Sequence, residues 1–241
     1  MWVLIAVGAV LAAGIALQSA LGFGASMLAS PLLLVFLAPV QVVSLLLLCG
    51  LLVGPLILAE GGQRMRVRWK EAWGLLAAAL VGLPLGVVVL GALGKQTMQL
   101  LVGVLVLLSL VAQQLRPARP TGPASGAVAG LASGVLTTST GLNGPPLILW
   151  LRGRGHSPDV FRATVTVVFL ATSVFGLLSL LVGTDPRLSI GLIVAAVVGT
   201  LTGWAIGARV FWRMEARHHR RAVTVVLAAT AIASLVAGAA G

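Results

Sequence analysis

The sequence LQSALGFGASMLASPLLLVFL (residues 17–37) and the sequence SGVLTTSTGLNGPPLILWL (residues 133–151) share one plan. In each, a turn rich in glycine, serine or threonine precedes a proline and an apolar run. Proline is favoured in the first turn of a helix because its missing N–H would have no partner there. Pro31 and Pro146 therefore predict the starts of two short helices, and the glycines before them permit sharp turns.

The composition around these two segments is that of a membrane protein. Of the 241 residues, 59% are hydrophobic and 9% are charged, whereas soluble domains carry about 25% charged residues. Several uncharged runs approach or exceed the ~20 residues that span a bilayer. The sequence thus predicts an all-α polytopic membrane protein. Its apolar segments are 2–17, 25–37, 40–59, 72–92, 98–112, 123–136, 145–151, 160–182, 188–208 and 222–240.

The net charge of +11 does not predict a nucleic-acid partner, because the basic residues lie in short loops between apolar segments. In such loops, Lys and Arg indicate the cytoplasmic side. With loops 61–71 and 209–221 in the cytoplasm, only Lys95 and Arg187 of the 16 Lys and Arg residues fall outside. This arrangement predicts a multi-pass protein of the plasma membrane, the bacterial inner membrane, with both termini outside.

The same charge pattern predicts two hairpins. Residues 122 and 152 both lie inside, so segment 123–151 must enter and leave the membrane on one side. Its 29 residues are too few for two full spans of ~20 residues each. We therefore expect two short or half-length helices that meet near the midplane at Thr137–Gly144, and a matching hairpin in residues 1–37.

Each hairpin is followed by three crossings, which is an odd number, so the two halves should be inverted repeats. The predicted units are a first repeat (1–115), a cytoplasmic linker (116–122) and a second repeat (123–241). Pairing Pro31 with Pro146 aligns the halves. Inverted repeats with broken helices are a common plan of secondary transporters.

Glycines four residues apart predict close helix packing, because small residues let helix backbones approach each other. The glycines expected to face other helices are Gly82, Gly86, Gly199, Gly203 and Gly207.

The segments GFGASMLASPLL (22–33) and STGLNGPPLILWL (139–151) resemble those of the sulfite exporter TauE/SafE family. The resemblance extends over essentially the whole chain. It implies a membrane protein that exports sulfite or small organosulfonates, so the expected partners are a small anion and the lipid bilayer, with a homo-oligomer as an open alternative.

The two glycine-rich turns predict the substrate site. A helix that starts inside the membrane directs free N–H groups and a positive dipole end towards an anion. Neutral hydroxyl and amide groups could replace the water around the anion, or could simply satisfy backbone groups at helix breaks. The candidate substrate-binding residues are Gln18, Ser19, Gly22, Phe23, Gly24, Ser26, Ser30, Pro31, Thr137, Thr138, Ser139, Thr140, Gly141, Asn143, Gly144, Pro145 and Pro146.

The ionisable residues predict no other chemistry. Glu60 and the remaining acidic residues lie in or beside loops, so no carboxylate-based proton relay is expected. Arg162 is either a topology signal or a group that attracts anions to the cytoplasmic mouth, and His156 is expected to be a solvated surface residue. Cys49 is expected to be inert, and no metal site or cofactor is predicted.

The predicted function is a secondary transporter that exports a small sulfur-containing anion by alternating access. A passive anion channel of the same fold and a non-transporting membrane scaffold are the alternatives. The sequence contains no HExxH, P-loop or GxSxG motif, so an enzyme is not predicted.

Overall fold

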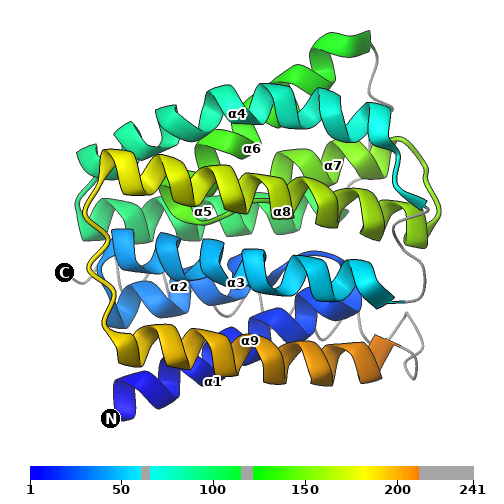
Figure 1. The fold of residues 1–241 in the computed structure, drawn as a ribbon. Helices are drawn as coiled ribbons and strands as arrows, with labels where there is room; N and C mark the ends of the chain where they lie inside the picture. The colour runs from blue at the N-terminus through cyan, green and yellow to red at the C-terminus, as the bar shows by residue number, and fades with distance from the viewer. Residues whose placement is uncertain (61–65, 115–121, 212–241) are drawn as a thin grey trace.

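The structure, a computed structural model, describes residues 1–60, 66–114 and 122–211. These residues form α-helices and no strands (Figure 1). The helices are α1 (Trp2–Leu21), α2 (Ala25–Phe36), α3 (Pro39–Ala59), α4 (Trp69–Ala92), α5 (Lys95–Gln114), α6 (Gly122–Thr140), α7 (Pro145–Gly153), α8 (Pro158–Gly183) and α9 (Ile190–Phe211).

Six of the described helices are long and apolar enough to cross a membrane: α1, α3, α4, α5, α8 and α9. Large apolar side chains such as Val88 and Leu181 are exposed on their outer faces, where lipid would cover them. Trp69 and Trp73 are exposed at the start of α4, as expected for interfacial anchors. The chain is therefore the multi-pass α-helical membrane protein that the sequence predicted. The predicted crossing 222–240 lies outside the described residues.

Several of the described connections between helices lie at two opposite ends of the bundle. The N-terminus and the connections that follow α2, α4 and α8 lie at one end, on the left of Figure 1. The end of α3, the start of α4 and the connection that follows α7 lie at the other end. Lys95 begins α5 directly after the α4–α5 connection and Arg187 lies between α8 and α9, so both belong to the first end. The basic residues of 66–70, at the start of α4, and of 152–154, at the end of α7, belong to the second. These described basic residues are thus divided between the two ends as the charge pattern predicted. Which end faces the cytoplasm stays a prediction.

Each predicted hairpin consists of one long and one short helix. In the first hairpin α1 has 20 residues and α2 has 12, and in the second α6 has 19 and α7 has 9. At 1.5 Å per residue, α1 and α6 are about 30 Å long, so the prediction of two short or half-length helices is wrong for the first helix of each hairpin. In α6 the reason is local: the Thr137–Thr140 segment, predicted as a turn, continues the helix.

Helix α2 begins six residues earlier than predicted. Gly22 and Gly24 have left-handed φ angles of 85° and 107°, so the chain reverses around Phe23 and the new helix starts at Ala25. Pro31 lies inside α2, whereas Pro145 and Pro146 do open α7 as predicted. The proposed pairing of Pro31 with Pro146 is therefore wrong, because glycine geometry and not proline sets the start of α2.

Glycines mediate the two closest helix contacts. On α4, a Cβ atom at Gly82 would collide with the carbonyl of Leu131 on α6, and one at Gly86 with that of Val135. Cβ atoms at Gly199, Gly203 and Gly207 of α9 would collide in the same way with backbone atoms of α1. The prediction that these five glycines face other helices is confirmed.

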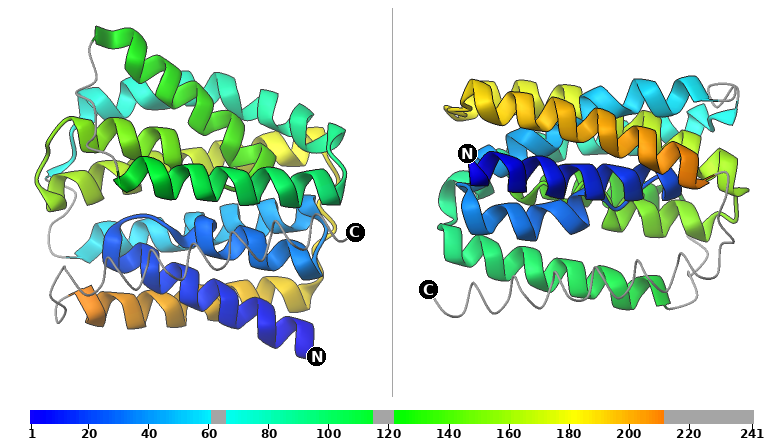
Figure 2. Two further views of the ribbon diagram at one scale, coloured as in Figure 1. Left: turned by 180° about the vertical axis from the view of Figure 1, so that it is seen from behind. Right: turned by 90° about the horizontal axis from the view of Figure 1, so that it is seen from below.

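In these two contacts, the long helix of each hairpin packs on a helix of the other half of the chain. Helix α1 of the first hairpin packs along α9, and α6 of the second hairpin packs along α4 (Figures 1 and 2). Helices α3 and α8 also contact each other. Such contacts are expected for two repeats related by a two-fold axis, although the inverted relation itself stays a prediction.

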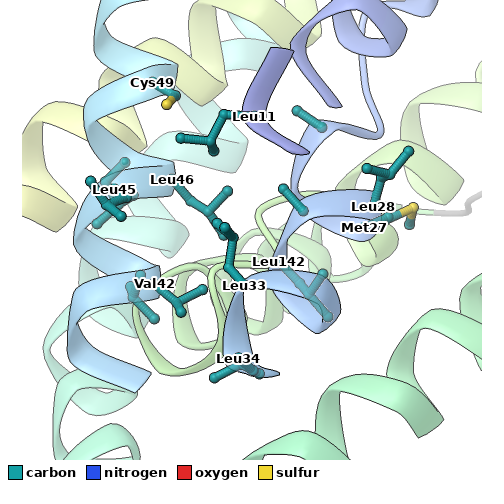
Figure 3. Packing of buried hydrophobic residues seen from close by; sticks show 14 of the residues in the cluster. Leu11, Met27, Leu28, Leu33, Leu34, Val42, Leu45, Leu46, Cys49 and Leu142 are labelled. Carbon is teal, nitrogen blue, oxygen red and sulfur yellow. The ribbon is translucent and has the colours of Figure 1, made fainter. Parts of the chain in front are cut away.

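The turn between α6 and α7 is inserted into the core formed by the first half. Leu142 in this turn is fully buried, together with Leu33 and Leu34 of α2 and Val42 and Leu46 of α3 (Figure 3). The second hairpin is therefore held against the first at its turn.

Candidate functional site

A small cavity lies where the two hairpins meet. Its volume is about 10 Å³, which is room for about one water molecule. Helices α1, α2 and α3 and the α6–α7 turn provide its walls. The lining residues are Leu11, Ile15, Gln18, Ala25, Ser26, Ala29, Leu46, Cys49, Gly50 and Asn143.

Three of the predicted substrate-binding residues provide the polar side chains of this cavity: Gln18, Ser26 and Asn143. Gln18 is only 8% exposed. Each amide can donate two hydrogen bonds and the serine hydroxyl can donate one. The structure therefore brings together one residue from each of α1, α2 and the α6–α7 turn, around a space without a charged lining residue.

The first turn of α2 adds backbone donors to the same space. Ala25 and Ser26 line the cavity, and the N–H groups of Ala25, Ser26 and Met27 have no acceptor among the described residues. Free N–H groups and the positive end of the helix dipole favour an anion at this position. The close approach of α1, where a Cβ atom at Gly14 would lie 2.8 Å from the Ala25 carbonyl oxygen, holds this turn in place.

The start of α7 differs from the start of α2. Pro145 and Pro146 have no N–H, and the Leu147 N–H donates a hydrogen bond of 3.1 Å to Ser133 Oγ. The expectation that α7 also presents free N–H groups at its first turn is therefore wrong. What the second hairpin contributes to the cavity is the Asn143 side chain.

A buried hydrogen bond joins the two hairpins beside the cavity. Ser30 Oγ on α2 donates to the carbonyl oxygen of Thr140, the last residue of α6, at 2.8 Å. Both residues are candidates from the sequence, and the structure places them in contact. This bond satisfies a carbonyl at the end of α6 that the helix itself cannot pair.

The remaining hydroxyl candidates of α6 satisfy backbone carbonyls. Thr137, Ser139 and Thr140 donate to carbonyls four residues earlier in α6 at 2.7–2.8 Å, and Thr138 donates to the Leu83 carbonyl of α4 at 2.6 Å. This is the structural role that the sequence left open for small polar residues at helix breaks. Ser133, which caps α7, was not among the candidates.

Other candidates shape the turns or pack away from the cavity. Gly22, Gly24, Gly141 and Gly144 flank the two turns. The Phe23 ring packs edge-on against Phe161 of α8, with ring centroids 6.2 Å apart. Ser19 is fully buried, and its hydroxyl has no partner among the described residues.

Sequence reasoning missed a buried ion pair at the end of the bundle where α3 ends. Arg162 on α8, predicted to be a topology signal or a group that attracts anions to the cytoplasmic mouth, is 3% exposed and donates to Glu60 Oε2 at 2.8 Å. The signal was present, because Arg162 lies inside the predicted apolar segment 160–182, and charges within spans have partners. His156 is likewise not solvated: it lies 2.7 Å from Glu71, and both side chains are mostly buried.

Comparison with known proteins assigns the family. The profile of the sulfite exporter TauE/SafE family matches residues 5–234. A probable sulfite/organosulfonate exporter TauE of Cupriavidus necator is 28% identical over 177 residues, which cover 70% of this chain and 69% of the relative. No solved structure matches the chain. With nearly its whole length matched, the chain belongs to the sulfite exporter TauE/SafE family of membrane proteins.

Proposed function

We propose that this protein exports a small sulfur oxyanion, sulfite or an organosulfonate, across the bacterial inner membrane by alternating access, with both termini outside. The observation that carries the proposal is the neutral cavity at the first turn of α2, together with the family assignment. The family implies a transport role and not a catalytic one.

The anionic head of the substrate binds between the first turn of α2 and Asn143. The free N–H groups of Ala25, Ser26 and Met27 face the anion from one side, and the amides of Gln18 and Asn143 complete its shell. A preorganised set of neutral donors offsets the loss of water around an anion. Because no Lys or Arg lines the described cavity, the anion is released without breaking a buried ion pair.

The size of the cavity supports a transporter in preference to an open channel. With about 10 Å³, it holds one water and is too small for an anion of four or more heavy atoms. The cavity must therefore widen for the substrate to enter, which is what alternating access requires of an occluded state. A passive channel with this fold would need a continuous wide path.

The two halves provide the moving parts. We assign residues 1–115 and 123–241 to the two inverted repeats and residues 116–122 to the cytoplasmic linker between them. The cavity lies at their contact, since α1, α2 and α3 come from the first half and Asn143 from the second. Movement of the second hairpin relative to the first would open this contact.

Transport assays in proteoliposomes test the proposal. The purified protein is reconstituted, and fluxes of sulfite, sulfoacetate, taurine and sulfate are measured with and without a pH gradient. We expect a saturable flux of sulfite or a sulfonate that is accelerated by substrate on the opposite side, because such exchange requires a carrier. A flux that rises linearly with concentration and lacks this acceleration would indicate a channel, and no flux of any of these anions would indicate a scaffold.

A further inference from the structure

The ion pair between Arg162 and Glu60 connects four helices at one end of the bundle. The Arg162 guanidinium of α8 donates to Glu60 Oε2 at 2.8 Å and to the Ser19 carbonyl of α1 at 2.6 Å. Glu60, which caps α3, accepts a second hydrogen bond of 2.6 Å from Trp204 Nε1 of α9. One carboxylate and one guanidinium therefore hold α1, α3, α8 and α9 together.

Arg162 also supports the turn of the first hairpin. A Cβ atom at Gly22, the left-handed glycine that ends α1, would lie 3.1 Å from Arg162 Cγ. The corresponding left-handed glycine of the second hairpin, Gly141, packs instead on the apolar side chain of Leu46. The aliphatic part of the Arg162 side chain thus packs on the turn of the first hairpin, at the end of the bundle predicted to face the cytoplasm.

The two partners differ in exposure. The Glu60 side chain is 15% exposed and the Arg162 side chain is 3% exposed, so the carboxylate is on the more open side of the pair. Beyond Arg162 lies Ser19, and the next residue along α1, Gln18, lines the cavity. Arg162 is therefore connected to the cavity wall through two adjacent residues of α1.

The chemistry of the pair suits such a displacement. A guanidinium binds a carboxylate, a sulfite or a sulfonate through the same planar set of N–H donors. Buried ion pairs are often no more stabilising than apolar residues of similar volume, so stability alone does not account for this pair.

We propose that Arg162 is a second anion-contact residue, at which the substrate oxyanion replaces the Glu60 carboxylate when it enters from the cytoplasm. The exchange releases Glu60 from Arg162, separates α3 and α9 from α8, and loosens the α1–α2 turn so that the cavity opens. This inference rests on the proposed function, since it assigns a role in the entry of the same substrate.

The decisive variant is Glu60→Gln, which keeps the size of the side chain and an acceptor for Trp204 but removes the competing charge. We expect sulfoacetate to bind the purified variant about tenfold more tightly than the parent, as read from the concentration that raises its unfolding temperature. Asp159→Asn is the matched control, because it removes the carboxylate of an exposed pair, Arg66 with Asp159 at 2.6 Å. It should leave the affinity unchanged.

A second measurement does not depend on which anion is transported. In a Cys49→Ser background, the Asn143→Cys thiol should be labelled faster from the cytoplasmic side when Glu60→Gln is also present, without any substrate. If sulfur oxyanions are not transported but this labelling still increases, the proposed function is wrong, whereas the claim that separation of Glu60 from Arg162 opens the cavity stands.

The double variant Arg162→Gln/Glu60→Gln removes both charges of the described pair and should fold, yet it should bind sulfoacetate at least tenfold more weakly than Glu60→Gln. The inference is overturned if the double variant binds as tightly as Glu60→Gln. It is also overturned if Glu60→Gln changes neither affinity nor labelling.

Discussion

Ser30 Oγ of α2 donates a 2.8 Å hydrogen bond to the carbonyl oxygen of Thr140 at the end of α6. The two residues are far apart in the sequence, and the bond fixes the short helix of the first hairpin to the long helix of the second. It is buried, so water cannot replace the lost partner when it is broken.

Ser30→Ala should therefore lower the free energy of unfolding by about 1 kcal/mol, measured as a lower unfolding temperature in detergent. Ser44→Ala is the matched control, because Ser44 Oγ donates at 2.8 Å to the Val40 carbonyl of its own helix. Equal effects of the two substitutions would mean that the bond between the hairpins has no special role.

Gly86→Leu should prevent folding or abolish transport. A side chain at this position would enter the backbone of α6 at Val135, and close backbone contact stabilises such helix pairs. Gly74→Leu on the same helix should be tolerated, because a Cβ atom there has nothing within 4 Å. Size-exclusion profiles and transport rates measure both, and a well-folded, active Gly86→Leu protein would contradict the described packing of α4 on α6.

The hairpin of α6 and α7 predicts that its two ends lie on one side of the membrane. In a Cys49→Ser background, Ala124→Cys and Ser157→Cys should react with an impermeant thiol reagent from the cytoplasmic side, because both positions are exposed. Gly94→Cys should react from the outside. Reaction of positions 124 and 157 from opposite sides would exclude the hairpin and with it the inverted repeat.

Much of the fold was predictable because it depends on long-range patterns of charge and hydrophobicity. The uncharged runs predicted the described helices, and the separation of Lys95 and Arg187 from the basic residues of 66–70 and 152–154 agrees with the two ends of the bundle. The spacing of Gly82 and Gly86 was sufficient to predict a contact face, because small residues four apart let helix backbones approach each other closely.

The details of the site depend on local geometry that the pattern does not contain. Pro31 suggested a helix start, but the left-handed conformations of Gly22 and Gly24 begin α2 earlier. Proline is compatible with both arrangements, so sequence alone did not distinguish them. The partner of Arg162 was not predictable either, because Glu60 is 102 residues away along the chain and meets it only through tertiary packing.

The central claim is that an anion binds between the first turn of α2 and Asn143. Asn143 lines the cavity with a neutral amide, so Asn143→Ala should remove a donor and reduce the affinity for substrate about tenfold, while expression stays normal. Asn143→Asp has nearly the same shape as the parent but places a negative charge against the anion.

The most direct test compares these two variants with the parent in sulfite flux from proteoliposomes, at equal amounts of reconstituted protein. We predict that Asn143→Ala retains a reduced, saturable flux and that Asn143→Asp has none, because repulsion adds to the loss of the donor. Sulfite transport by Asn143→Asp at the rate of the parent protein would contradict the proposed site.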